Sequence, residues 1–143
     1  MIKKYLILAS VFIAFTAPAH AETVSGENGA KELTDQIMSK IVSGDIEASL
    51  NLARPYWDFP PKQIDDMYDK TRASRKKHKG LYGETFGFEF IDSKIVGESL
   101  IRLRYIEKAA NTPLLWTFHF YNTKEGWKLN MFEWKDQFQS VFD

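Results

Sequence analysis

The hydrophobic pattern of this chain changes its period once, at Gly80, and the change divides the sequence into a helical half and a strand half. Before Gly80 the apolar residues recur every three or four positions, which is typical of helices that bury one face. After Gly80 they alternate with polar residues, which is typical of strands that bury one face. Helices followed by antiparallel strands predict an α+β fold, with the helices on one face of the sheet.

Three helices are expected before Gly80. The first stripe of apolar residues starts at Ala30 and stops at the Ser-Gly-Asp break at 43–45. There the glycine supplies a C-terminal turn and the aspartate an N-cap for the second helix. This second helix ends before Pro55. The pair Pro60-Pro61 then opens the third, because a proline in the first turn has no hydrogen bond to lose.

About four strands are expected after Gly80, joined by short, turn-rich connections at 109–113 and 122–126, so that neighbours in sequence pair antiparallel. One face of the predicted sheet turns toward the helices as a concave apolar wall, made of Phe86, Phe88, Phe90, Leu103, Trp116, Phe118 and Met131. The other face carries no predicted carboxylate and is interpreted either as solvated or as a surface for a dimer or an anionic partner. Its candidate interface residues are Arg102, Arg104, His119, Tyr121, Lys128 and Asn130.

Three short sequences in this pattern are similar to the nuclear transport factor 2-like superfamily (a cystatin-like α+β cone), and to an exported bacterial domain of unknown function within it. They are Ser43-Gly44-Asp45-Ile46, the aromatic strand Trp116–Tyr121 and Gly126-Trp127-Lys128-Leu129. The resemblance covers about residues 30–134. It implies a cone-shaped fold with a pocket between helices and sheet, and frequent dimerisation through the outer sheet face. It implies no single activity, since the superfamily holds isomerases, cyclases, dehydratases and binding modules.

The first 21 residues have the order of a secretory signal. Lys3 and Lys4 precede an uncharged run at 6–15, and Ala19-His20-Ala21 follows as a small-residue cleavage site. The run is shorter than the ~20 residues that span a bilayer. We therefore expect cleavage after Ala21, a flexible leader at 22–29, a single domain at 30–143 and no transmembrane segment after cleavage. The protein is predicted to be periplasmic or secreted, without a lipid anchor or disulfides because it has no cysteine.

The counts of charged and metal-binding residues limit the classes of function that the sequence supports. Nineteen basic and 19 acidic residues argue against a dedicated nucleic-acid binder, which would show a basic excess. Two histidines in the expected mature chain and no cysteine give no spacing typical of a metal site, and no cofactor is predicted. Six basic residues lie between Lys70 and Lys79. They are interpreted either as a solvated helix face or as a docking site for an anionic surface outside the cytoplasm.

Two functions remain open. The favoured one is an exported, non-enzymatic binding or interaction domain, which takes a small apolar or amphipathic ligand into the cone or pairs with a second copy. Its predicted ligand-binding residues are Tyr56, Trp57, Phe88, Leu103, Trp116, Phe118 and Met131. The alternative is an isomerase or dehydratase that uses a carboxylate and a tyrosine in the cone. Its weak catalytic candidates are Glu133, Asp58, Tyr68 and Tyr105. Each also has a structural interpretation. Glu133 is interpreted as a strand end in water, Asp58 as a helix cap, and the two tyrosines as core residues whose hydroxyls reach the surface.

Overall fold

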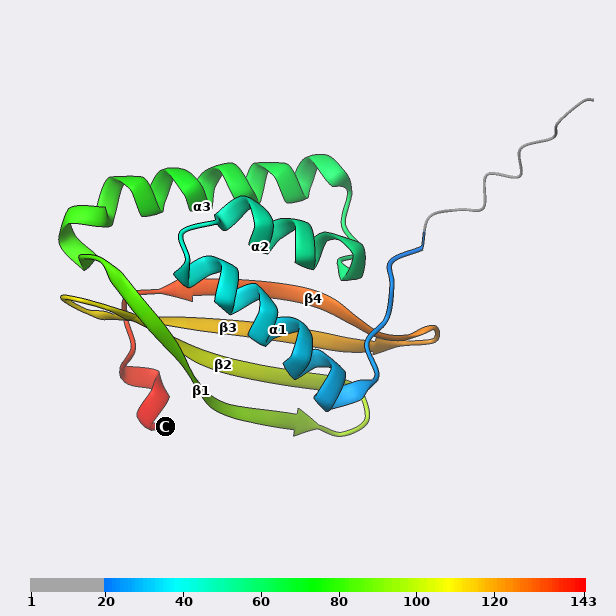
Figure 1. The fold of residues 1–143 in the computed structure, drawn as a ribbon. Coiled ribbons are helices and arrows are strands. Elements are labelled where there is room, and N and C mark those ends of the chain that lie inside the picture. The colour runs from blue at the N-terminus through cyan, green and yellow to red at the C-terminus, as the bar shows by residue number, and fades with distance from the viewer. Residues whose placement is uncertain (1–19) are drawn as a thin grey trace, which may run out of the picture.

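The computed structural model describes residues 20–143 as four antiparallel strands in the order β1-β2-β3-β4, with three helices on one face (Figure 1). The helices are α1 (Gly26–Val42), α2 (Ile46–Ala53) and α3 (Pro61–Tyr82), and two 3-10 turns are η1 (Arg54–Tyr56) and η2 (Gln139–Phe142). The strands are β1 (Thr85–Val96), β2 (Leu100–Ala109), β3 (Pro113–Thr123) and β4 (Gly126–Lys135). The predicted α+β class is confirmed. The predicted signal lies outside the described residues, except for its last two.

The turn between α1 and α2 forms as its sequence predicts. Gly44 takes a φ of +83°, and the Asp45 side chain accepts a hydrogen bond of 2.9 Å from the Ala48 backbone nitrogen. Helix α3 begins at Pro61, but it runs past Gly80 and ends at Tyr82, followed by Gly83 as its C-cap with a φ of +78°. A Cβ at Gly83 would lie 2.9 Å from the side chain of Ala110, so this later glycine is the one that the backbone requires.

Helix α1 begins four residues before the predicted start, at Gly26 rather than Ala30. The preceding segment, for which a flexible leader was expected, makes backbone hydrogen bonds to two distant parts of the domain. The Glu22 nitrogen donates to the Pro55 carbonyl at 2.7 Å, and the Val24 nitrogen donates to the Trp127 carbonyl at 2.9 Å. Residues 22–25 therefore lie against the domain as a short strap.

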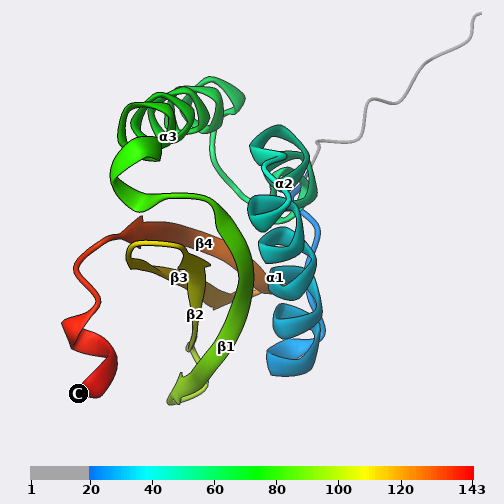
Figure 2. The same ribbon diagram turned by 60° about the vertical axis from the view of Figure 1, so that its left-hand side comes forward.

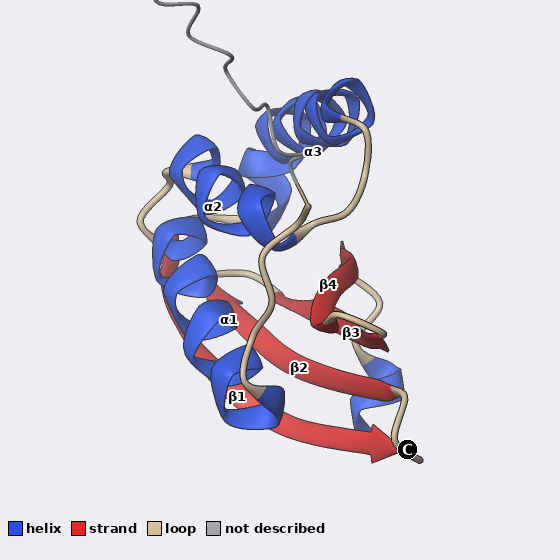
Figure 3. Ribbon diagram, turned by 90° about the vertical axis from the view of Figure 1, so that its right-hand side faces the viewer, coloured by secondary structure: helices blue, strands red, loops and turns tan. Residues whose placement is uncertain are grey.

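The core lies between α1, α2 and the inner face of the sheet (Figure 3). Its largest fully buried side chains come from β2 and β3, with Tyr105, Trp116 and Phe118 at the centre. Removing each such side chain from water stabilises the fold by ~1.5–3 kcal/mol. Helix α1 packs on β1 and β2, whereas α3 crosses above β3 and β4 (Figures 2 and 3). The η2 turn lies on the opposite side of the sheet from α1 (Figure 2).

Extra residues in the edge strands change which side chains face the core. Phe120 pairs with Leu129 but His119 pairs with Met131, so Asn130 is an extra residue in β4. The alternation predicted for Met131 is therefore wrong: this side chain lies on the outer face and is 40% exposed. A similar shift in β1 leaves Phe86, also predicted to face inward, 71% exposed.

None of the helices within residues 20–143 is long and apolar enough to cross a membrane.

Candidate ligand cavity under helix α3

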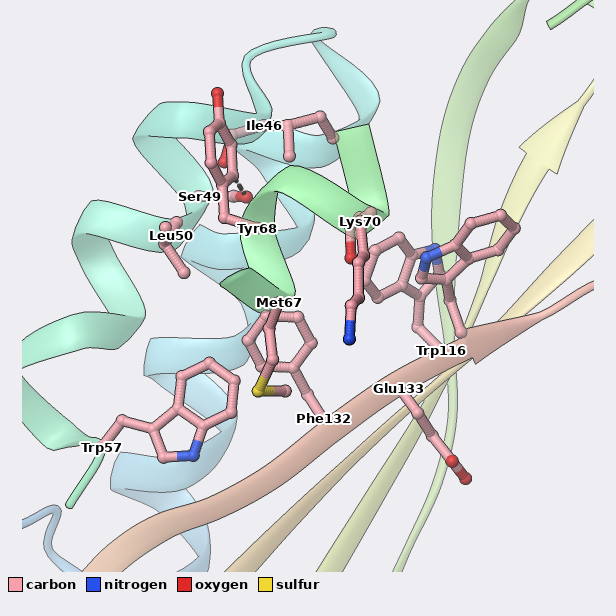
Figure 4. A pocket seen from close by; sticks show the side chains of 12 residues that line it. Ile46, Ser49, Leu50, Trp57, Met67, Tyr68, Lys70, Trp116, Phe132 and Glu133 are labelled. Carbon is pink, nitrogen blue, oxygen red and sulfur yellow. Dashed lines mark hydrogen bonds between the residues drawn. The ribbon is translucent and has the colours of Figure 1, made fainter. Parts of the chain in front are cut away.

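A cavity of about 270 Å³ lies between α2, α3 and the strands β3 and β4 (Figure 4). We call it the α3 cavity. Most of its lining is apolar or aromatic, and it comprises Ile46, Ser49, Leu50, Trp57, Met67, Tyr68, Lys70, Thr71, Trp116, Phe132, Glu133 and Trp134. This volume is just below the ~300–1,000 Å³ that is usual for the sites of drug-sized ligands. The cavity therefore suits a small molecule.

The composition of α3 explains why the space beneath it stays unfilled. Only two residues of this 22-residue helix are buried, Ile64 in its first turn and Tyr82 at its end. Between them the helix turns Met67 and Thr71 toward the sheet, and neither is large enough to fill the gap to β4. The helix is thus anchored near both ends and stands away from the sheet around Met67 and Thr71.

The cavity walls present the faces of indole rings, because the polar edges of two indoles are already hydrogen bonded. Trp57 Nε1 donates to the Asn130 carbonyl at 3.0 Å, and Trp116 Nε1 donates to Glu107 Oε2 at 2.7 Å. The Trp57 ring lies 4.8 Å from the Phe132 ring, centroid to centroid, and Trp116 stacks on Trp134 at 6.1 Å. These rings form a continuous aromatic floor.

Few polar groups reach into the cavity. The Ser49 hydroxyl donates to the Ile46 carbonyl at 2.6 Å, and the Tyr68 hydroxyl points away from the sheet (Figure 4). Glu133 borders the cavity, but its carboxylate points away from α3 (Figure 4). Lys70 differs: its side chain extends from α3 toward the sheet beside Phe132 (Figure 4). It is the one charged group directed into this space among the residues that line it.

A buried ion pair lies next to the cavity and was missed by the sequence analysis. Glu107 is fully buried, and its carboxylate accepts two hydrogen bonds from Arg75, of 2.9 and 2.6 Å. Thr85 donates a third bond at 2.6 Å and Trp116 the fourth. The Arg75 guanidinium also lies 5.8 and 5.7 Å from the ring centroids of Trp116 and Trp134. The pair ties the middle of α3 to β2. Glu107 follows Ile101, Leu103 and Tyr105 at two-residue spacing, which could have placed it inside.

The residues predicted to bind ligand lie in several places. Trp57 and Trp116 line the α3 cavity. Leu103 and Phe118 are completely buried in the core, and Phe88 is partly buried at its edge. Tyr56 instead borders a hollow beside the N-terminal strap, and Met131 lies on the outer face. The cavity residues that the sequence analysis did not name include Phe132 and Trp134, which turn inward because of the extra residue at Asn130.

The four catalytic candidates do not come together. Glu133 turns away from the cavity, and Asp58 lies at the β4 edge, where its carboxylate is 3.3 Å from the Lys128 amino group. Tyr105 is buried beneath α1: its hydroxyl donates to Asp35 at 2.8 Å and lies 2.6 Å from the Thr34 hydroxyl. Burial raises the pKa of Tyr105 far above its ordinary value, so this phenol stays protonated. Tyr68 borders the cavity, and its hydroxyl points away from the sheet (Figure 4).

The outer face differs from the expectation of a surface without carboxylates, because Asp92 and Glu133 both lie on it. Arg104 is nearly buried: it donates to the Asp92 carboxylate and to the Ser140 carbonyl of the C-terminal segment. The hydrogen bond from Arg104 lowers the pKa of Asp92. Lys128 is nearly buried too, paired with Asp58 and Glu125. Arg102 also lies within ion-pair distance of Asp92, at 3.7 Å, so three of the predicted interface residues already have partners within the chain.

The remaining predicted interface residues make fewer contacts within the chain. Tyr121 and Asn130 are exposed. His119 is half-buried, and its Nδ1 has no hydrogen-bond partner among the described residues; the same holds for Nε of Arg102. Burial lowers the pKa of His119 below its ordinary value of 6.5; Glu133 opposes the shift and Arg102 adds to it.

The basic run on α3 is partly neutralised by neighbouring acids. Arg72 pairs with Asp69 and Lys79 with Glu84, in addition to the buried pair of Arg75. The remaining three cations of the run have no ion pair within residues 20–143, and they are Lys70, Lys76 and Lys77.

No known family profile matches this sequence, and no curated protein is detectably similar to it. A solved structure with a related outline is that of a Campylobacter jejuni protein described as a proposed NTF2-like transpeptidase. The two chains superpose with a TM-score of 0.48 and are 12% identical, over 71% of this chain and 97% of the other. A likeness of this degree concerns the outline of the fold and says nothing about activity.

Proposed function

We propose that this domain binds a small apolar or amphipathic ligand in the α3 cavity. The observation that carries the proposal is an aromatic-floored space of about 270 Å³ whose indole nitrogens at Trp57 and Trp116 already have partners. Such walls offer ring faces and aliphatic contact but few hydrogen bonds, which favours ligands with an apolar body. The isomerase or dehydratase alternative has less support, because its carboxylates and tyrosines lie apart.

Dye binding tests this proposal directly. N-phenyl-1-naphthylamine is small, neutral and apolar, and its fluorescence rises on leaving water. We expect saturable binding of one dye per chain, together with a change in tryptophan fluorescence, because three of the four tryptophans line the cavity. Native mass spectrometry of protein purified without ligand checks for a bound small molecule. Absence of saturable dye binding would contradict the proposal.

A matched pair of variants shows where the dye binds. Met67→Trp enlarges a side chain that points into the cavity beside Trp57 and Phe132 (Figure 4), so it should fill the space and abolish dye binding. Ala73→Trp adds the same ring to an exposed position of α3 and should leave binding unchanged. If both variants lose dye binding to the same extent, or if neither loses it, the dye binds elsewhere.

We also propose that the outer sheet face pairs with a second copy of the chain. The observation that favours this is a group of exposed apolar side chains on adjacent strands, at Val96, Leu100, Tyr121 and Met131. Burying them against the same group of a partner would remove apolar surface from water. Sedimentation equilibrium should give a dimer for the native chain and a monomer for Tyr121→Glu. A native monomer at high concentration would contradict this second proposal.

A further inference from the structure

We infer that the ligand of the α3 cavity is an anionic amphipath, with its negative head at Lys70 and its apolar body on the aromatic floor. This inference rests on the proposed function and adds a charge to the ligand. The head could be a carboxylate or a sulfonate, which present the same negative oxygen atoms to an ammonium group.

Lys70 is available because the acids near it along α3 are bonded to other cations. Its i−4 neighbour Asp66, the usual partner on a helix, is bonded to Lys62 at 3.1 and 2.8 Å. The adjacent Asp69 pairs with Arg72 at 3.4 Å. Glu133, at the cavity rim, points its carboxylate away from Lys70 (Figure 4). Lys70 is exposed at the cavity rim, and its ammonium extends toward an apolar space into which no lining carboxylate points.

A cationic ligand is the natural competitor, because aromatic faces attract cations. One such position is already taken in this protein: the Arg75 guanidinium lies against both Trp116 and Trp134. The charge of Arg75 is balanced by Glu107, so it adds little net field, but it competes with a second cation for the rings of Trp116 and Trp134. A ligand cation would also be repelled by Lys70. The arrangement therefore favours an anion over a cation.

Three probes with one decyl chain test the charge of the ligand: decanoate, 1-decanol and decyltrimethylammonium. Each is measured below its micelle concentration, at neutral pH, by displacement of N-phenyl-1-naphthylamine and by calorimetry. We expect decanoate to bind roughly tenfold more tightly than decyltrimethylammonium, with decanol between them. The preference for decanoate should weaken with added salt, because screening acts on the charge and not on the chain.

Two lysine variants on α3 assign the preference to one side chain. Lys70→Gln should bring decanoate and decanol to equal affinity while leaving decanol binding unchanged. Lys77→Gln removes an exposed charge from the same helix and should keep the native order of the probes. Lys70→Glu should reverse the order and favour decyltrimethylammonium. Circular dichroism on each variant confirms that it is folded.

The outcomes separate this inference from the function on which it rests. Decanol binding without any preference for decanoate, or a preference that survives Lys70→Gln, would overturn the inference and leave the proposed cavity function standing. Tighter binding of the cation by the native chain would overturn it as well. If neither the dye nor any decyl probe binds, the proposed function fails and the inference fails with it.

Discussion

At the scale of single residues, a carboxylate inside a sheet is stable only where donors surround it, and Glu107 has four. Two come from Arg75, one from Thr85 and one from Trp116. Charged residues on strands are usually assigned to the solvent face, so only the two-residue spacing from Tyr105 indicated that Glu107 faces inward. Its partner Arg75 lies 32 positions away on another element, which no local pattern predicts.

Removing the negative charge at Glu107 should destabilise the domain. Glu107→Gln keeps the size of the side chain but leaves the guanidinium of Arg75, which is only 18% exposed, without a counter-charge. We expect the free energy of unfolding, from urea denaturation, to fall by about 3 kcal/mol, at the low end for a broken buried pair. The double variant Arg75→Met/Glu107→Leu should recover at least half of the loss. A loss below about 1 kcal/mol for Glu107→Gln would contradict the assigned role.

The lowered pKa of His119 predicts a pH dependence of stability. Because burial disfavours the charged imidazole, the folded chain takes up a proton less readily than the unfolded chain, whose pKa is about 6.5. The contribution of His119 to stability is therefore complete above the unfolded pKa and is lost as the pH falls from there through the lower pKa of the folded chain. His119→Gln should lose less stability between pH 7 and pH 5 than the native chain, in melts followed by circular dichroism. Parallel curves for the two proteins would contradict this.

At the scale of elements, the period of the hydrophobic pattern was enough to predict the α+β class and the antiparallel order. These depend on which face of each element is apolar, and that is a local property of the sequence. The position of the extra residue, Asn130, cannot be predicted in this way. A bulge leaves the composition of β4 unchanged and only shifts its later residues to the opposite face. The floor of the α3 cavity depends on this shift, since Phe132 and Trp134 reach the inner face only through it.

The bulge in β4 predicts opposite effects for two neighbouring residues. Met131→Ala, on the outer face, should change the free energy of unfolding by less than about 1 kcal/mol. Phe132→Ala, which removes a ring packed on Trp57 and Phe118, should cost about 2–4 kcal/mol, somewhat less than a fully buried phenylalanine. It should also weaken dye binding. The reverse order would mean that strict alternation continues through β4.

At the scale of the whole molecule, the helices and the sheet meet closely on one side and stand apart on the other. Helix α1 packs directly on β1 and β2, whereas α3 is fixed by Ile64, Tyr82 and the Arg75–Glu107 pair. The α3 cavity follows from this difference. A polar helix long enough to reach from η1 to β1 must cross the sheet, and its small or polar side chains leave the space beneath it open.

The N-terminal strap would stay on the mature domain if the chain is cut after Ala21, and it should then contribute to the stability of that domain. The new terminus would be Glu22, whose nitrogen already donates to the Pro55 carbonyl, and an ammonium group there can still donate. Val24 adds a second backbone bond, to Trp127, and packs against the core. Two backbone hydrogen bonds contribute ~0.5–1.5 kcal/mol each.

We therefore expect a chain that begins at Glu22 to be as stable in urea as a longer one, and a chain that begins at Gly26 to lose about 1–3 kcal/mol. Val24→Ala, which keeps the backbone bonds, should lose less than the truncation does. Equal stability of the Glu22 and Gly26 chains would show that the strap contributes nothing, and N-terminal sequencing of the exported protein would show whether cleavage leaves it in place.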